Sequence, residues 1–449
     1  MTSFHIPEPE LALLASDPDA ITPDRAREVH AHLAVCSDCA DTFDTFVSTF
    51  AGEDDDAYLA SERSVSSRSY GALVARENAD ADEQLKGYFA EPEKAAWRNL
   101  AAQRKFVHGG VVRRLAKKAF DICASEPLNA LTFADAAIAV AEAIPTSQYP
   151  SNALHDLRGR AYKERANALN RLGEPAAALE ALEHAEREYD QTTSNTLGLG
   201  NVALVRASAY FLLEQLPEAD LEVQIAEGLY ARLGDAERHT KARYLRGNIK
   251  YQSHDIEAAI ELFHTVLRYG ESVDSKQWVA TASNALGNCV LDINDIENAA
   301  VLFSKALAIF RITGPTDDRI AAEWGMARVL LVRGRFQESL RELQRVRAQY
   351  TTLGMTNQAG VAALDEMEAM VALGLFKQVA ALAHAVFVTF TEAGMLTSAL
   401  TALAYIQTAA AEGRLTREQV REVRRFVKRV EREPELLFVP PPDDPTKKR

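Results

Sequence analysis

A repeat of about 40 residues is the feature that most constrains how this chain folds. If Gly287 is numbered as position 8 of a unit, the same phase recurs along residues 151–396. The position-8 residues are Ala166, Ala207, Gly247, Gly287, Ala327 and Met367, at steps of 41, 40, 40, 40 and 40 residues. Self-similarity at a fixed period of this length is the signature of a solenoid, in which each unit packs on its neighbours.

Two other positions in the unit indicate that each repeat is a pair of antiparallel helices. Position 20 is small, as at Ala178, Ala219, Ala259, Ala299 and Ser339. Small residues at positions 8 and 20 allow two helices to approach closely. Position 15, between two helical patterns, holds residues that tolerate a left-handed backbone: Gly173, His254, Asn294, Gly334 and Gly374. The sequence therefore predicts an all-α fold with six helical hairpins over 151–396.

This pattern resembles the tetratricopeptide repeat. The resemblance rests on the small residues at positions 8 and 20, and on Phe303 and Ala306 at positions 24 and 27. The period is longer than the usual ~34 residues, and Met367 and Val379 depart from the small-residue rule. The resemblance implies an α-solenoid in which positions 2, 5, 9 and 12 of each first helix line a concave, peptide-binding face.

Polar side chains occupy many of these first-helix positions, and asparagine recurs at position 9. The predicted partner-binding residues are Lys163, Asn167, Lys241, Tyr244, Asn248, Asn288 and Arg328, with Asn170, Tyr251 and Asn284 on the same face. Side-chain amides there can pair with the backbone of an extended peptide. The alternative is a solvated polar face without a ligand. Lys163 with Asn167 resembles part of the carboxylate clamp of chaperone-binding repeats, but the rest of that clamp is missing.

The first fifty residues contain a histidine and two cysteines at metal-ligand spacing. His32 and Cys36 are four residues apart on a predicted helix and share one face, and Cys39 follows after a turn. One imidazole and two thiolates suit a tetrahedral zinc ion, and His5 is the candidate fourth ligand. Three alternatives stay open: His30 as the histidine ligand, free thiols without metal, and a redox switch of the cysteines.

Residues 1–50 resemble the zinc-finger domain of bacterial anti-sigma factors, which carries a His-x3-Cys-x2-Cys signature. The resemblance implies a small three-helix zinc-binding domain that binds a sigma factor. Residues 1–56 hold thirteen acidic residues against two arginines, and the whole chain has a net charge of −14. An acidic segment of this kind repels phosphate backbones. We therefore expect a basic protein partner and no direct binding of nucleic acid.

Composition divides the rest of the chain into four further segments. The predicted segments are an acidic and serine-rich flexible linker at 51–89, a degenerate N-terminal helical cap at 90–150, a C-terminal capping hairpin at 397–435 and a tail at 436–449. In the N-terminal cap we expect a helix over 91–108 that is broken by Gly109 and Gly110. The last helix carries seven basic residues, which indicates either the polar outer face of the cap or a docking face for the acidic N-terminus.

No motif of a known catalytic site occurs in the sequence, so we expect no enzymatic activity. No apolar run approaches the ~20 residues of a membrane span, and no secretory signal is visible. The sequence predicts a cytoplasmic protein-binding regulator. It would exert anti-sigma-like control of transcription through its zinc domain, with the repeats as a docking surface. The alternative is a tetratricopeptide-repeat scaffold in which the zinc domain is only structural.

Overall fold

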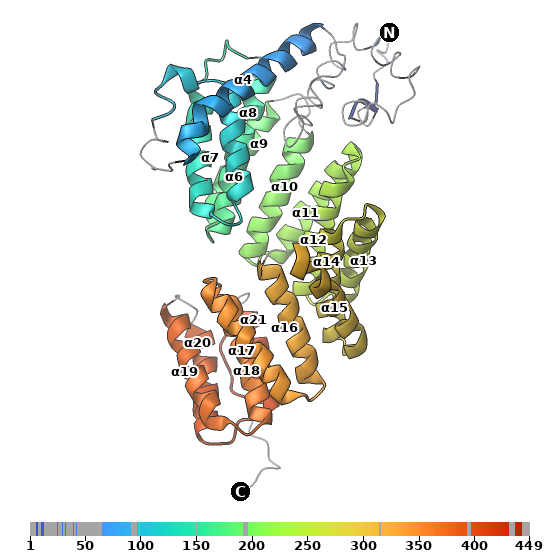
Figure 1. Cartoon of the computed structure of the whole chain (residues 1–449), viewed down its shortest axis with the longest axis vertical. Helices are drawn as coiled ribbons and strands as arrows, with labels where there is room; N and C mark the ends of the chain where they lie inside the picture. The colour runs from blue at the N-terminus through green and yellow to red at the C-terminus, as the bar shows by residue number, and fades with distance from the viewer. Residues whose placement is uncertain are drawn as a thin grey trace. The chain divides into compact units, whose positions relative to one another are not determined.

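The structure, a computed structural model, consists of helices, and no β-strand occurs in the part of the chain that it describes (Figure 1). The described residues are 6–7, 10–12, 25, 29, 32, 39, 42, 65–90, 97, 99–149, 151–191, 196–313, 316–392, 397–430 and 436–441. The chain divides into two compact units, Met1–Ile249 and Lys250–Arg449.

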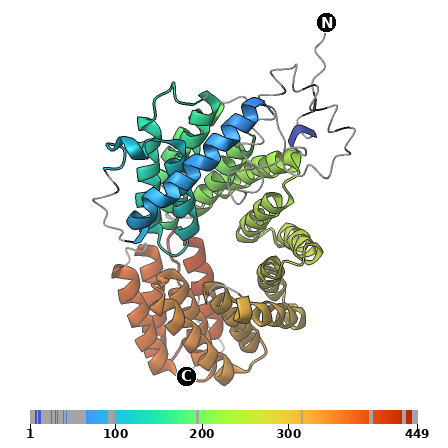
Figure 2. The ribbon, with the colours of Figure 1, turned by 45° about the horizontal axis from the view of Figure 1, so that its top comes forward.

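Hairpins of antiparallel helices make up most of the first unit. Its elements are α4 (Val65–Ala90), the short 3-10 helix η3 (Arg104–Phe106), α6 (Gly109–Ile122), α7 (Pro127–Ala143), α8 (Ser151–Arg171), α9 (Pro175–Asp190), α10 (Thr196–Leu212) and α11 (Leu216–Leu233). Helix α12 (Ala236–Gln252) contains the boundary between the units. Helix α6 packs on α7, α8 on α9 and α10 on α11, and α4 crosses α6 obliquely (Figure 2).

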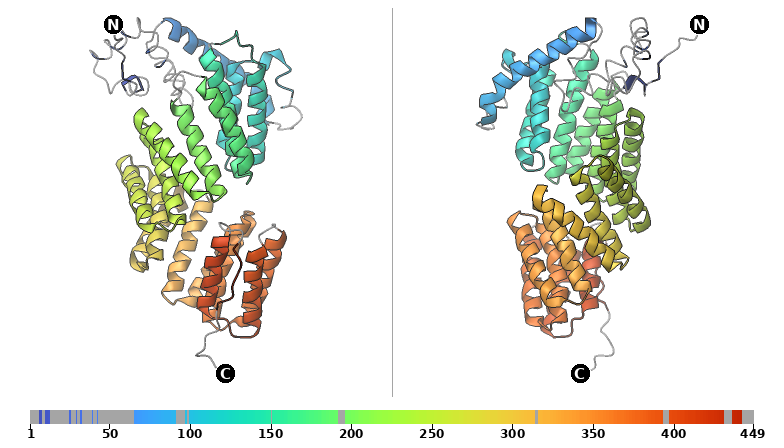
Figure 3. Two further views of the ribbon diagram at one scale, coloured as in Figure 1. Left: turned by 180° about the vertical axis from the view of Figure 1, so that it is seen from behind. Right: turned by 45° about the vertical axis from the view of Figure 1, so that its right-hand side comes forward.

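The second unit continues the same alternation of first and second helices. It comprises α13 (Ile256–Ser272), α14 (Lys276–Asp292), α15 (Ile296–Thr313), α16 (Thr316–Val332), α17 (Phe336–Thr352), α18 (Thr356–Ala372), α19 (Phe376–Glu392), α20 (Thr397–Ala411) and α21 (Arg417–Val430). Helix α14 packs on α15, α16 on α17 and α18 on α19. At the C-terminal end, α20 packs on α19, and α21 packs on both α20 and α18 (Figure 3). The helices predicted from the 40-residue phase are thus confirmed.

Small residues at the repeat positions create the space in which the hairpins pack. Gly287 of α14 and Gly325 of α16 both face the buried ring of Phe303 on α15. A Cβ atom would lie 2.8 Å from this ring at Gly287 and 2.3 Å from it at Gly325. Position 8 and position 20 are buried in every unit, including Met367 and Val379, the two residues that depart from the small-residue rule.

The turn between the two helices of each hairpin has a left-handed residue at position 15, as predicted. The φ angles are 77° at Gly173, 60° at His254, 67° at Asn294, 76° at Gly334 and 74° at Gly374. Glu214 occupies the same position in the second hairpin, with φ of 59°. Glutamate is not a residue that signals this conformation, so the sequence did not predict a left-handed residue at this position. The hairpin geometry, and not the intrinsic preference of the side chain, decides the conformation there.

The flexible linker predicted at 51–89 is wrong over Val65–Ala90, which forms the 26-residue helix α4. Ala81 and Leu85 of this helix are fully buried in the hydrophobic core of the first unit. Glu77 accepts a hydrogen bond from Arg113 of α6 at 3.0 Å. The linker was predicted from the acidic and serine-rich composition of the segment as a whole. The few apolar residues that pack on α6 have little effect on that average composition.

Gly109 and Gly110 do not break a helix as predicted, because α6 begins at Gly109. Residues 99–103 form turns, and η3 follows them, so the helix predicted over 91–108 is wrong from residue 99 onward. A Cβ atom at Gly110 would lie 2.1 Å from the carbonyl oxygen of Glu77. Gly110 therefore allows the close approach of the α4 and α6 backbones.

Residues 436–441 include a side chain that packs on the last helices, so the predicted tail is wrong at this point. The ring of Phe438 lies 5.6 Å from the ring of Tyr405 on α20 and 4.9 Å from that of Phe426 on α21. Phe438 belongs to a short apolar run at 436–439 that is followed by three prolines, and this isolated run gave no indication that the ring would be partly buried.

Candidate functional site

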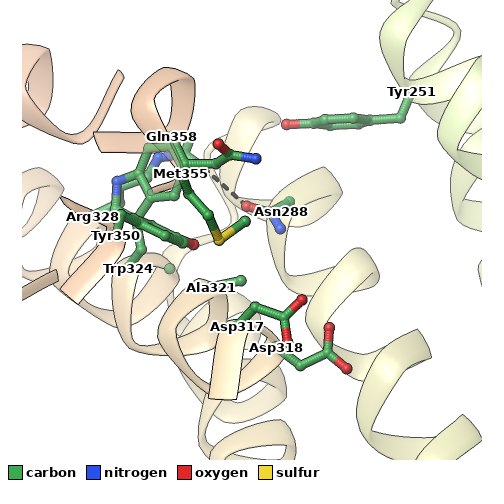
Figure 4. A pocket seen from close by; sticks show the side chains of 11 residues that line it. Tyr251, Asn288, Asp317, Asp318, Ala321, Trp324, Arg328, Tyr350, Met355 and Gln358 are labelled. Atoms are coloured by element: carbon green, nitrogen blue, oxygen red, sulfur yellow. Dashed lines mark hydrogen bonds between the residues drawn. The ribbon is translucent and has the colours of Figure 1, made fainter. Parts of the chain in front are cut away.

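A cavity of about 350 Å³ opens in the second unit where the first helices α14, α16 and α18 follow one another (Figure 4). We call the surface formed by these three helices the first-helix face. The lining residues are Tyr251, Asn288, Asp317, Asp318, Ala321, Trp324, Gly325, Arg328, Tyr350, Met355 and Gln358. Three successive hairpins contribute to the lining, so no single repeat forms the cavity.

Arg328 is held at the cavity by two neighbours on α14. Its Nη1 donates a hydrogen bond to Oδ1 of Asn288 at 2.9 Å (Figure 4). Its Nη2 donates to Oδ1 of Asp292 at 2.9 Å. The phenol of Tyr251 donates to Oδ2 of the same Asp292 at 2.6 Å. Burial lowers the pKa of the Arg328 guanidinium, but Tyr251 and the carboxylates of Asp365 and Asp292 raise this pKa above its ordinary value. The guanidinium is therefore charged and fixed in place.

Aromatic side chains form one wall of the cavity, and contacts outside the cavity hold that wall. The indole Nε1 of Trp324 donates a hydrogen bond to Oδ2 of Asp365 on α18 at 2.8 Å. The rings of Trp324 and Tyr350 meet edge to face, with centroids 6.0 Å apart. Asp365 is itself ion-paired with Arg424 of α21. The indole is therefore linked through Asp365 to the C-terminal helix.

Two adjacent carboxylates, Asp317 and Asp318, lie in the first turn of α16 at the edge of the cavity. The amide of Gln277 donates a hydrogen bond to Asp318 at 3.3 Å. Burial, and then the charge of Asp317, raise the pKa of the Asp318 carboxyl. Burial and both aspartates also raise the pKa of the Tyr350 phenol. Within the described residues, no basic side chain contributes to the pKa of Asp318.

Of the predicted partner-binding residues, Asn288 and Arg328 are brought together in this cavity, and Tyr251 joins them. The sequence pattern did not indicate Asp317, Asp318, Tyr350, Met355 and Gln358 as site residues. Asp317, Asp318 and Gln358 lie near the N-terminal ends of first helices, Tyr350 belongs to a second helix, and Met355 precedes α18. Trp324 falls at position 5 of its repeat, so the repeat register contained the signal needed to find it.

In the first unit, the predicted pair Lys163 and Asn167 is engaged within the protein. Lys163 is ion-paired with Glu164, and its side chain is 6% exposed. The amide of Asn167 donates to Oε2 of the same Glu164 at 2.7 Å. The Lys163 ammonium also lies 5.7 Å from the ring centre of Phe120, and that of Lys241 lies 5.9 Å from it. This arrangement differs from an open carboxylate-binding pair because Glu164 already occupies the donors.

Tyr244 and Asn248 are partly buried on α12, in the first unit. The other predicted first-helix residue of that unit, Asn170, donates a hydrogen bond to the backbone carbonyl of Val205 at 3.2 Å. The residues predicted as one continuous face are therefore distributed over both units, and only those of the second unit contribute to the cavity.

Two of the four predicted zinc ligands, His5 and Cys36, lie outside the described residues. His32 is partly buried, and Cys39 is buried in one hydrophobic cluster with Ile6 and Leu11 and with residues of α10 and α11. Among the residues that can be placed, no group of three or more histidine, cysteine, aspartate or glutamate side chains is arranged to hold a metal ion. The zinc site remains a prediction from the sequence motif, whose imidazole and thiolate donors suit zinc.

At three positions the basic residues of the last helix are paired with acidic residues of α18. Arg417 and Arg421 bond to Oε1 of Glu368 on α18, at 2.9 and 2.7 Å. Arg424 pairs with Asp365 on the same helix. These arginines therefore pair with buried acidic residues inside the second unit, while their own side chains remain partly exposed.

No helix in the described part of the chain combines the length and apolar character required to cross a membrane.

Comparison with known proteins identifies the fold but no family. No family model and no curated protein matches the chain. The fold is similar to that of aspartyl phosphate phosphatase F from Bacillus subtilis, at 13% identity and a TM-score of 0.50 over 94% of this chain and 96% of that one.

Two further solved structures are also similar. A Rap protein complexed with competence and sporulation factor is 13% identical, with a TM-score of 0.48 over 78% of this chain and 99% of that one. A putative kinesin light chain of Podosopora anserina with TPR-like repeats is 20% identical, with a TM-score of 0.37 over 44% of this chain and 98% of that one. At 13% identity, the likeness to aspartyl phosphate phosphatase F extends to the fold alone.

Proposed function

We propose that this chain is a protein-binding scaffold or regulator that holds an extended segment of a partner on the first-helix face of its second unit. The observation that carries the proposal is the cavity formed by α14, α16 and α18. Because successive hairpins contribute to the lining, an extended segment that runs along the stack can contact all of them. Fixed polar groups such as Asn288 and Arg328 supply specificity in a lining that also contains aromatic side chains.

Anti-sigma-like control through the N-terminal segment is the second candidate, and it rests on the His32-x3-Cys36-x2-Cys39 motif and the acidic composition. Leu11 and Ala12 of that segment are fully buried in a cluster that includes Leu204 of α10. Apolar side chains buried within the chain are not available to a sigma factor. This packing favours the scaffold, with the N-terminal segment in a structural role.

Site-specific photo-crosslinking in the full-length protein tests the proposal. A photoreactive amino acid at Gln358, which is exposed at the cavity, is compared with one at Val301, which is 66% exposed on α15. We expect one defined partner segment to crosslink at Gln358 and not at Val301, as identified by mass spectrometry. Equal labelling at both positions, or no labelling at Gln358, contradicts the proposal.

A Cys39→Ser variant carrying the same photoreactive residue at Gln358 separates the two candidate functions. A scaffold retains the crosslink because its partner contacts the repeats. Under anti-sigma-like control the crosslinked partner is lost together with the metal-binding motif.

A further inference from the structure

The charges around the cavity leave two carboxylates without a described cationic partner. Arg328 is the basic residue of the lining, and its two outer nitrogens already donate to Asn288 and Asp292. The ion pairs of the described α16 residues involve Arg319, Glu323 and Arg328, and neither Asp317 nor Asp318. The cavity edge therefore carries uncompensated negative charge, consistent with the raised pKa of Asp318.

The wall beside these carboxylates has the character of a cation-binding surface. Trp324, Tyr350 and Met355 line the cavity together with the two aspartates. In Figure 4 the side chains of the two aspartates lie below Ala321, on one side of the cavity. The side chains of Trp324, Tyr350 and Met355 lie on another side of it. A cation is attracted by the face of an aromatic ring, most strongly by that of tryptophan. The long hydrocarbon stem of a basic side chain packs on the same apolar surfaces.

The wall is organised before any ligand arrives. The Trp324 indole is bonded to Asp365, and Asp365 is paired with Arg424, so the ring does not have to be ordered on binding. The Gly325 position in the lining has no side chain, and a Cβ there would lie 2.3 Å from the ring of Phe303. Preorganised contacts of this kind reduce the entropy lost on binding.

Other occupants fit the cavity less well. An acidic side chain would meet Asp317 and Asp318 while the outer nitrogens of Arg328 are already engaged. An apolar side chain would remove water from the two carboxylates without compensation, which is costly. A bare divalent ion such as calcium needs six or more oxygen ligands, and the described residues hold no metal-binding group.

We propose that the cavity receives a lysine or arginine side chain of the extended partner segment, with its cationic head at Asp317 and Asp318 and its stem against Trp324 and Tyr350. This inference rests on the proposed function, and it specifies the chemistry of the partner.

Binding of the full-length protein to an immobilised positional-scanning library of short peptides tests this inference. In each pool one position is fixed as one of the twenty amino acids, and the others are degenerate. We expect pools with a fixed lysine or arginine to bind the wild type about tenfold better than pools with alanine at the same position. The isosteric double variant Asp317→Asn/Asp318→Asn loses this preference. The matched control Glu257→Gln/Glu261→Gln, on exposed positions of α13, retains it.

Four results contradict the inference. If peptides bind without preference for a basic residue, or if the preference survives in Asp317→Asn/Asp318→Asn, the cavity does not receive a basic side chain, while peptide binding stands. A preference equally reduced in the Glu257→Gln/Glu261→Gln control indicates a general charge effect and overturns the site. Absence of binding to every pool overturns peptide binding itself. Circular dichroism of each variant establishes that its helices are intact.

Discussion

At the scale of single residues, the same amino acid has opposite roles in different places. Gly110 of α6 allows the backbone of α4 to approach, because a Cβ there would lie 2.1 Å from the Glu77 carbonyl oxygen. Gly87 of α4 has no neighbouring atom within 4 Å of such a Cβ. A backbone carbonyl in a helix cannot move aside as a side chain does. The packing of α4 on α6 therefore requires a residue without a side chain at Gly110, whereas it makes no such requirement at Gly87.

We expect Gly110→Ala to destabilise the protein by at least about 1–3 kcal/mol, the usual cost of overpacking. The control Gly87→Ala should stabilise it by about 0.5–1 kcal/mol, because alanine is the better helix former and its methyl group meets open space. The midpoints of urea-induced unfolding, followed by circular dichroism, measure both changes. Equal effects of the two substitutions would show that α4 does not approach α6 at Gly110.

The cavity carboxylate Asp318 gives a stability effect that depends on pH. Burial and Asp317 raise its pKa above the ordinary value of 3.8, so the folded state favours the protonated form more than the unfolded state does. The stabilising contribution of this group is present only at low pH and is lost as the pH rises through the raised pKa. At neutral pH the charged carboxylate therefore opposes folding.

We expect Asp318→Asn to raise the thermal unfolding midpoint at pH 7, by a gain below about 1 kcal/mol because the site is partly solvated. The difference from the wild type should shrink as the pH falls toward 3.8. Asp292→Asn should instead lower the midpoint at pH 7, because Asp292 accepts hydrogen bonds from both Arg328 and Tyr251. Differential scanning calorimetry over a pH series distinguishes these outcomes, and a lower midpoint for Asp318→Asn at pH 7 contradicts the assignment.

At the scale of helices, α18 is notable for three buried acidic residues within four positions of its sequence. Asp365, Glu366 and Glu368 are each 1% exposed. Glu366 accepts a hydrogen bond from Arg347 of α17 at 2.6 Å, and the other two are paired with arginines of α21. Buried carboxylates of this kind are tolerated only when their charge is compensated. The C-terminal helix is thus required for the integrity of α18 and, through Asp365 and Trp324, for the wall of the cavity.

Removing one arginine should show how strongly α18 depends on α21. We expect Arg424→Met to destabilise the protein by about 3–5 kcal/mol, because Asp365 is left as a buried charge without its cation. Arg425→Met is the matched control: Arg425 is 65% exposed and pairs with the exposed Glu418, so its loss should cost less than about 1 kcal/mol. Chemical denaturation monitored by tryptophan fluorescence measures both.

A second substitution tests the cause. Asp365→Asn in the Arg424→Met background should recover part of the lost stability, because the uncompensated charge is removed. If the double variant is no more stable than Arg424→Met, the arginine acts through packing and not through charge.

The zinc site predicted in the N-terminal segment gives a prediction about the metal content of the protein. We expect the purified protein to contain one zinc ion per chain, and Cys39→Ser to lose most of it, because a hydroxyl group is a poor substitute for a thiolate ligand. Cys289→Ser is the control: Cys289 is also buried, and burial raises the pKa of its thiol to about 12. Elemental analysis by mass spectrometry gives the zinc content. Equal zinc content in the wild type and in Cys39→Ser excludes this ligand.

At the scale of the whole molecule, the repeats produce a binding surface that no single repeat contains. Each hairpin of the second unit supplies a few side chains to the first-helix face, and stacking brings those of α14, α16 and α18 to one cavity. In a solenoid each repeat contacts its neighbours only, so such surfaces extend along the stack. Function can therefore be specified by the few residues that differ between repeats, while the shared positions maintain the packing.

The sequence by itself determined the order of the helices, the left-handed turns at Gly173 and His254, and part of the site, Asn288 and Arg328. These features are local or repeat at a fixed period, so spacing along the chain is sufficient to reveal them. Only the tertiary structure decided that α4 packs as a helix, that Arg424 pairs with Asp365, and that Asp317 meets Tyr350 at one cavity. Each of these depends on contacts between residues far apart in the chain. The free energy that fixes such contacts, from burial and ion pairing, is supplied only when the helices pack together.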